Sequence, residues 1–290
     1  MDYHNHRFED YSLMVFKDDS LYALLPANKV GSKLYCHQGL TYGSFILHEK
    51  ATLLNAFEAF KGLLQFLHSA GIEQLEIKVI PTFYNLIPSD ELIYFLYKAK
   101  AQLIKRDLLM VIDYNHPLPF QKNRREGINK ARRNGLKVTI DTNFEGFWNE
   151  VLIPNLRHKH QVNPVHSLEE IQKLALNFPD NIKQVSVYKD NKIIAGTTIF
   201  LTKTTVHPQY VSGNAAKNMY GSLDLAYDFV IHHFKEGRRY FDFNISSEEN
   251  GTVLNTGLIF WKETCGARAF AADNYLVETA SYKSLNLAIK

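Results

Sequence analysis

The sequence predicts an α/β protein built from two tandem copies of one small unit with a mixed sheet. A nine-residue segment at 15–23 returns at 187–195, the strands and helices after each copy follow the same order, and prolines separate the two halves. A chain of 290 residues also exceeds the size at which one hydrophobic core usually keeps growing. We therefore expect two domains of the same fold, at 1–114 and 115–290.

The repeated segment reads VFKDDSLYA in the first copy and VYKDNKIIA in the second. Apolar residues occupy the same positions in both copies, and the centres at 18–19 and 190–191 hold only Asp and Asn. These short side chains tolerate the left-handed backbone of tight turns and bond to it locally. Each copy is therefore predicted to form a β-hairpin.

After its hairpin, the first half is predicted to form a strand, a glycine-containing loop, a helix, a strand, a helix and a strand. The first helix has an apolar face from Leu53 to Leu67 and ends at Gly71. The second helix is expected to be capped by Ser89 and to keep Leu103 in register. The expected elements are 34–36, 39–43, 53–67, 75–80, 89–103 and 108–112.

The second half repeats this order. Its long helix is expected to close at Gly237, and the strands on either side of that helix should be joined by a right-handed parallel crossover. Pro117 and Pro119 disfavour helix between the halves, which places the domain boundary there. The expected elements are the strand 206–212, the loop 213–221, the helix 223–234, the strand 240–243, the short helix 258–264 and a last strand or hairpin at 267–277.

Composition excludes several classes of protein. With 46% apolar and 22% charged residues, the chain has the composition of an ordinary globular protein. The absence of a run of about 18 apolar residues and the polar N-terminus predict no membrane insertion and a cytoplasmic location. A net charge of +3 argues against a general nucleic-acid binder and against DNA as a partner. Cys36 and Cys265 have no metal-ligand spacing, and we expect reduced thiols and no metal site.

Three segments carry a family resemblance. The run NRREGINKARRNGLKV at 123–138, GRRYFDF at 237–243 and FWKETCG at 260–266 resemble, in order and spacing, motifs of the FemABX family. The resemblance covers about residues 105 to 275. It implies tandem domains of the acetyltransferase (GNAT) fold, and a C-terminal segment at 280–290 that returns to the first domain.

The same resemblance implies an N-acyltransferase that moves an acyl or aminoacyl group to an acceptor amine. The implied acceptor is a small molecule or a muropeptide of a peptidoglycan precursor, and the implied donor is acyl-CoA or aminoacyl-tRNA, with tRNA then a partner. We slightly favour the thioester, because no coiled-coil arm is visible and the net charge is modest. The loop 214–222 departs from CoA-dependent relatives, since it lacks their glycine motif and only Gly221 and Ser222 could cradle phosphate.

Arg124 and Arg125 are candidate anion ligands. They lie at the start of a predicted basic helix, where the helix dipole adds partial positive charge. The alternative is a solvated surface helix with no ligand.

Asp242 alternates with Phe241 and Phe243 on a predicted strand, so its side chain points away from theirs. A carboxylate there can orient or deprotonate an acceptor amine. The alternative is a structural partner of Arg238, in which case Glu248 and the neighbouring Glu249 are the other candidate bases.

Lys262 matches the lysine of the family motif, and it would neutralise charge on a carbonyl or a phosphate. Its alternative is a surface lysine. Tyr220 and Tyr42 occupy corresponding loops of the two halves, each beside a glycine, and a phenol there would protonate the leaving group. Ring packing is the alternative for both tyrosines.

Ligands of open α/β sheets bind beyond the carboxyl ends of the strands. We therefore expect Tyr220, Gly221 and Ser222 on one side of the cleft, Asp242, Phe243 and Asn244 on the other, and Lys262 reaching over it. A non-catalytic ligand-binding protein with a degenerate cleft is the competing reading, and a nucleic-acid-binding module is the third.

Overall fold

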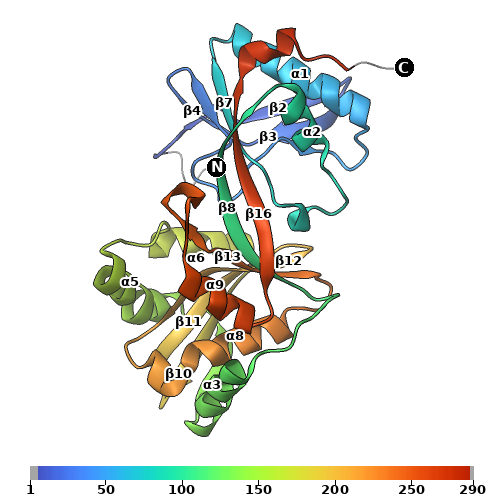
Figure 1. Cartoon of the computed structure of the whole chain (residues 1–290). Coiled ribbons are helices and arrows are strands. Elements are labelled where there is room, and N and C mark those ends of the chain that lie inside the picture. The colour runs from blue at the N-terminus through green and yellow to red at the C-terminus, as the bar shows by residue number, and fades with distance from the viewer. Residues whose placement is uncertain (1–5, 288–290) are drawn as a thin grey trace. The chain divides into compact units, whose positions relative to one another are not determined.

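The computed structural model describes residues 6–287 and is an α/β protein (Figure 1). Two compact units make up the described part. Unit 1 comprises the described residues of Met1–Leu108, Ser247–Val253 and Ala271–Lys290, and unit 2 comprises Leu109–Ser246 and Leu254–Phe270.

The units are interleaved along the chain, which a single boundary between two halves does not capture. Strand β8 (Gln102–Asp113) carries the chain from unit 1 into unit 2, and β16 (Arg268–Glu278) carries it back. Residues 109–114 thus lie in unit 2, and the described residues from 271 onward lie in unit 1. The division into two independently folding domains stays a prediction.

Unit 1 contains the first hairpin in a small sheet of its own. β2 (Leu13–Lys17), β3 (Ser20–Leu25) and β6 (Ile46–Leu47) form this antiparallel three-stranded sheet. Five further strands belong to the eleven-stranded sheet of the described chain and have the order β1-β4-β5-β7-β16, with β5 and β7 parallel. The remaining elements are β1 (Glu9–Asp10), β4 (Asn28–Val30), β5 (Lys33–Tyr35), α1 (Leu53–Ser69), β7 (Gln74–Lys78), η2 (Thr82–Tyr84), α2 (Glu91–Lys98) and the two-residue strand β14 (Ser247–Glu248).

The core of unit 1 lies on the apolar face of α1. Phe57, Phe60, Leu64 and Leu67 recur at helical spacing on that face and are buried. Leu285, from the C-terminal segment, is buried in the same core. The last residues of that segment, 288–290, lie outside the described part of the chain.

The second predicted helix of this unit is shorter than expected. α2 begins after Asp90 rather than Ser89, and it ends at Lys98. Lys100 has a φ of +53°, which breaks the helix, and Leu103 already belongs to β8. The helical spacing of Leu103 was therefore coincidental.

The other six strands of the eleven-stranded sheet, in the order β9-β10-β11-β12-β13-β8, form the sheet region of unit 2. Only β12 and β13 are parallel in this run, and they are connected through α8. The elements are α3 (Lys122–Arg133), β9 (Lys137–Asp141), α4 (Phe144–Gly146), the π-helical η3 (Phe147–Leu152), α5 (Ile153–His160), α6 (Leu168–Asn177), β10 (Ile182–Lys189), β11 (Lys192–Leu201), β12 (Thr205–Gly213), α7 (Lys217–Tyr220), α8 (Ser222–His233), β13 (Tyr240–Ile245) and α9 (Thr256–Thr264). A two-residue strand β15 (Val253–Leu254) and the turn η4 (Glu249–Gly251) precede α9, and η5 (Thr279–Lys283) follows β16.

Both predicted hairpins are present, and they share an irregularity. The register of β2 with β3 shifts between Val15 and Phe16, and that of β10 with β11 shifts between Val187 and Tyr188. These are the same positions of the repeated segment. The internal repeat therefore extends to a β-bulge, which no residue pattern predicted.

No helix within residues 6–287 is long and apolar enough to cross a membrane. The cytoplasmic location stays a prediction.

Candidate active site

The candidate site lies where β12 and β13 part. Their parallel ladder has two residue pairs, Thr205 with Tyr240 and Val206 with Phe241. On its other side β12 carries a bulge against β11, and Pro208 in this stretch has no N–H to donate. The two strands therefore open immediately beyond Val206 and Phe241.

A buried histidine–carboxylate pair stands at this opening. Nδ1 of His207 lies 3.1 Å from Oδ2 of Asp242, and the two side chains are 4% and 0% exposed. The other oxygen, Oδ1, accepts the backbone N–H of Asn244 at 2.7 Å. A buried carboxylate needs such partners, because each lost hydrogen bond leaves charge uncompensated in a poorly solvated place.

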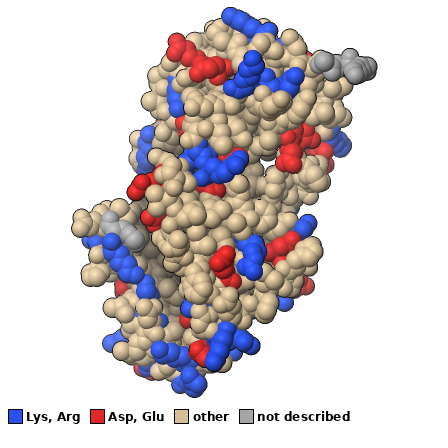
Figure 2. Space-filling model, viewed as in Figure 1, with Lys and Arg blue, Asp and Glu red and all other residues tan. Residues whose placement is uncertain are grey.

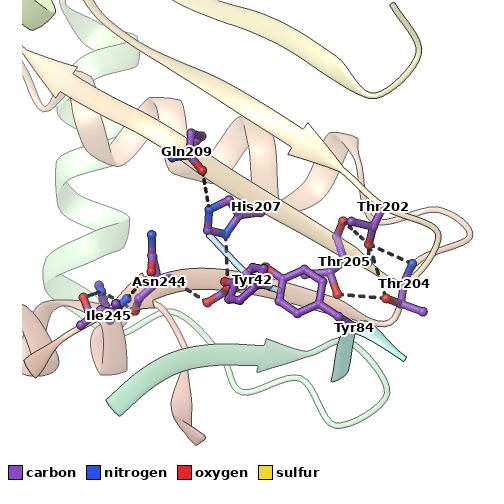
Figure 3. Close-up of polar contacts among 11 residues, drawn as sticks. Tyr42, Tyr84, Thr202, Thr204, Thr205, His207, Gln209, Asn244 and Ile245 are labelled. Atoms are coloured by element: carbon purple, nitrogen blue, oxygen red, sulfur yellow. Dashed lines mark hydrogen bonds and ion pairs between the residues drawn. The ribbon is translucent and has the colours of Figure 1, made fainter. Parts of the chain in front are cut away.

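Gln209 extends the pair on the other side of the ring. Nε2 of His207 lies 3.1 Å from Oε1 of Gln209, as Figure 3 shows. With an acceptor atom beside each ring nitrogen, the contacts fit a ring that is protonated on both nitrogens. If the Gln209 amide is turned by 180°, its NH2 group donates to Nε2 instead, and the ring is neutral with its proton on Nδ1. In both cases Asp242 accepts the Nδ1 proton, and the ring is held in one orientation.

The backbone after Asp242 turns sharply. Asn244 has a φ of +67°, and its own side chain accepts the N–H of Ile245 at 2.7 Å. Asn is one of the few residues that adopt this conformation readily, because its amide replaces the lost backbone bonds. The turn, visible in Figure 3, directs the carbonyls of residues 244 and 245 toward α9.

Lys262 on α9 donates hydrogen bonds to these carbonyls. Its Nζ donates to the carbonyls of Asn244 and Ile245, both at 2.9 Å, and to Oγ of Ser246 at 2.8 Å. The side chain is 3% exposed. Burial lowers the pKa of Lys262 to about 8, although the Asp242 charge acts to raise it. Its ammonium thus binds the turn and does not extend into solvent.

The structure therefore groups three of the predicted site residues, Asp242, Asn244 and Lys262, around one turn. Arg238, the alternative partner of Asp242, instead donates to the carbonyls of Thr202 and Phe234. His207 and Gln209 were not predicted. The available signal was two polar residues at alternate positions of an otherwise apolar strand.

Arg124 and Gly221 have structural partners. Arg124 forms a short ion pair with Asp224 of α8, and its guanidinium lies 5.6 Å from the centre of the Trp261 ring. Gly221 has a φ of +69°, and a Cβ there would stand 2.3 Å from the carbonyl oxygen of Gly127. Only glycine therefore allows α3 to approach the start of α8 this closely. Beside it, Ser222 has a buried Oγ without a hydrogen-bond partner in the described structure.

Arg125 is exposed beside a surface cavity of about 650 Å³ in unit 2. Tyr220 is half-buried, with Nζ of Lys189 5.3 Å from its ring centre. The two other predicted residues belong to unit 1. Tyr42 lies with its hydroxyl 3.2 Å from that of Tyr84, and Glu248 follows the end of β13 in strand β14.

Positive charge gathers at two places in unit 2. Figure 2 shows Lys and Arg over the part of the face where Figure 1 draws α3. Near the start of α8, burial and the neighbouring ammonium of Lys159 lower the pKa of Lys217 to about 8. Two ammonium groups this close favour an anion between them. Within the described residues, no group of three or more His, Cys, Asp or Glu is placed to hold a metal ion.

The corresponding strands of unit 1 do not part at this point. By the spacing of the repeat, Tyr35 of β5 corresponds to His207. Glu76 of β7 corresponds to Asp242 by its place in the parallel ladder, because each residue directly follows the second ladder pair of its unit. Tyr35 and Glu76 form a third ladder pair, and the N–H of Cys36 then donates to the carbonyl of Glu76 at 2.8 Å. The opening described above is therefore a property of unit 2.

No protein-family profile matches the chain, and no curated protein matches its sequence. Solved structures do match its fold. The C-terminal domain of a protein assigned as a lysylphosphatidylglycerol synthetase from Agrobacterium fabrum superposes with a TM-score of 0.64 at 13% identity, over 96% of this chain and 87% of that one.

Two further structures are similar over most of their length. FemX gives a TM-score of 0.64 at 10% identity, over 96% of this chain and 90% of that one. L-PGS from Bacillus licheniformis gives 0.63 at 13% identity, over 97% and 90%. At identities this low, the three structures show a shared fold and nothing of activity. The predicted α/β fold is confirmed, and the likeness to FemX agrees with the motifs that resemble the FemABX family.

Proposed function

We propose that the protein is an N-acyltransferase whose reaction takes place at the opening between β12 and β13 of unit 2. The main support is that these strands separate after two residue pairs and that the buried His207–Asp242 pair lies at the opening. An opening between central parallel strands admits an extended acyl donor and exposes backbone N–H groups to its carbonyl.

The reaction needs one nucleophile and one route for a proton. The acceptor amine attacks the carbonyl carbon of a thioester or ester, the C–N bond forms, and the C–S or C–O bond breaks. The amine proton must leave as the bond forms, and the leaving sulfur or oxygen must gain one. We infer that Nε2 of His207 takes the amine proton and then gives it to the leaving sulfur or oxygen, while Asp242 holds the Nδ1 proton and stabilises the intervening imidazolium.

Lys262 acts in this scheme as a positioning residue. Its bonds to the turn at the end of β13 fix the backbone that holds Asp242 through the Asn244 N–H. Its positive charge also lies close enough to interact with the Asp242 carboxylate. Loss of this lysine should therefore disturb the orientation of the His207 ring.

The donor is proposed to be an acyl-CoA, with its phosphates near the start of α8. The orphaned Ser222 hydroxyl and the Lys159–Lys217 pair support an anion there. Aminoacyl-tRNA is the other donor that the resemblance to the FemABX family implies. The acceptor is proposed to be an amine of a small molecule or of a cytoplasmic muropeptide precursor.

Transfer assays test the proposal directly. The full chain is incubated with acetyl-CoA, longer acyl-CoAs or aminoacyl-tRNA and a panel of amines, and released CoA thiol or deacylated tRNA is measured. We expect turnover with one donor class and its loss in His207→Ala. Turnover that survives unchanged in His207→Ala would remove this histidine from the mechanism.

A non-catalytic binding protein is the second candidate. Two observations favour it. Asp242 and Lys262 already form hydrogen bonds with the protein's own backbone, and the loop before α8 is poor in glycine. Calorimetry distinguishes the two. Micromolar binding of a donor without turnover on any amine would favour the second candidate.

A further inference from the structure

The two hairpins of the repeat have different surroundings. In unit 2, the outer face of β10–β11 is covered by the segment from α4 to α6, where Ile193 packs against Phe144, Phe147 and Trp148. Leu21 is the counterpart of Ile193 in unit 1, and it is exposed. No described segment covers the outer face of the first hairpin as α4 to α6 cover the second.

That outer face is an apolar patch. Met14 is 65% exposed and Phe16 is 54% exposed. Three further apolar residues of the same sheet, Leu21, Leu24 and Ile46, are also exposed. Single exposed apolar residues are common, but contiguous patches of this kind mark interaction surfaces.

The edge of the hairpin is also open. In unit 2, β9 pairs antiparallel along the outer edge of β10 and places Val138 opposite Val187. Among the described strands, β2 pairs only with β3. Beside this edge, β2 and α1 enclose a groove of about 520 Å³ with Val15, Ala59 and Leu63 in its lining. Within the described residues, unit 1 thus lacks a counterpart of the strand β9 that completes the repeat in unit 2.

We propose that a second copy of this chain supplies that strand, through antiparallel pairing of the two β2 strands about a two-fold axis at Val15. Two copies of one strand related by a two-fold axis in this way are necessarily antiparallel, the sense that β9 has on β10. The pairing places Val15 opposite Val15 of the second copy, which reproduces the Val138–Val187 pair of unit 2.

The neighbouring positions fit the same register. Met14 lies opposite Phe16 of the second copy, and Phe16 lies opposite its Met14, so the two most exposed apolar residues of β2 cover each other. Thioether sulfur packs favourably against aromatic rings. Lys17 lies opposite Leu13 of the second copy and can lay its alkyl chain over it. No acidic residue lies within β2 to oppose its own copy.

Sedimentation velocity or light scattering tests the dimer, with Phe16→Glu as the disrupting variant. Phe178→Glu is the matched control, since Phe178 is 52% exposed in unit 2. We expect dimers of the unaltered chain and of the control at about 100 μM, and at least about 30-fold weaker association of Phe16→Glu. An unaltered chain that is monomeric at this concentration overturns the proposal.

Cysteine cross-linking tests the register. Val15→Cys places two thiols opposite each other at a spacing within disulfide range, whereas Met14→Cys faces a phenylalanine. The native Cys36 and Cys265 do not interfere, because both are buried and burial raises the pKa of each thiol. Mild oxidation should give covalent dimers of Val15→Cys and not of Met14→Cys. Equal cross-linking of both, or of neither, excludes the proposed pairing.

Discussion

The parallel strand pairs β5–β7 and β12–β13 come from the same repeat, yet one is closed and the other is open. In unit 1, a loop closes the gap: Gly43 forms a β-bridge with Lys78, and Nζ of Lys78 donates to the carbonyl of Leu40 at 3.0 Å. In unit 2, the bulged β12 and the turn at Asn244 keep the strands apart. The fold supplies two equivalent places, and local backbone irregularities decide which one can admit a ligand.

The corresponding acids differ in the same way. Glu76 forms an ion pair with Lys33 at 2.7 Å, near the surface, and such pairs contribute little to stability. Asp242 is fully buried against a histidine. One position of the repeat thus carries a surface ion pair in unit 1 and a group suited to proton transfer in unit 2.

The largest expected effect comes from neutralising these two acids separately. Asp242→Asn should lower kcat by about 100-fold or more, because the His207 ring loses the charge that stabilises its protonated form. Glu76→Gln should leave kcat within about two-fold. Steady-state kinetics of both variants measure the difference. Similar losses in both would mean that unit 1 is also catalytic.

Matched substitutions in the hairpins should differ in stability. Ile193→Asn places an amide among the aromatic residues under α4 to α6 and should lower the free energy of unfolding by about 3 kcal/mol. Leu21→Asn should cost less than about 1 kcal/mol, because Leu21 is exposed. Urea unfolding at low protein concentration measures both. A large loss in Leu21→Asn would show that its face is covered within one chain.

The smallest expected effect is the pH dependence that Lys262 gives to the stability of unit 2. With a pKa of about 8 in the folded protein, Lys262 loses its proton before the unfolded chain does. Between pH 8 and the ordinary lysine pKa of about 10.4, the lysine is therefore protonated more often in the unfolded chain than in the folded protein. The free energy of unfolding consequently rises with pH across this range.

Lys262→Met isolates this contribution. Between about pH 8 and pH 10, the free energy of unfolding of the unaltered protein should rise relative to that of the variant, by at most about 3 kcal/mol. A parallel pH profile for the two proteins would show that the lysine pKa is not lowered. The kcat of Lys262→Met should also fall, because the turn that holds Asp242 loses its three bonds.

Elements set by local pattern were predictable from the sequence, and contacts across the sheet were not. The hairpins, β12, β13 and α9 follow from turn residues and periodicity, so Asp242 could be placed at a strand end. The partners of Arg124 and Asp242 could not be found, because Asp224 and His207 are distant in sequence. The anion role of Arg124 and Arg125 and the roles of Tyr42, Tyr220 and Glu248 stay predictions.

The return of the chain to unit 1 sets the order in which the protein can be completed during synthesis. β7 has its antiparallel neighbour β16 only after residue 278 has been made, and Leu285 fills the core beside α1 later still. Domains generally fold as they emerge from the ribosome, N-terminal first. Here unit 1 must wait for β16 and Leu285, and the apolar face of α1 stays incompletely covered until these residues have been made.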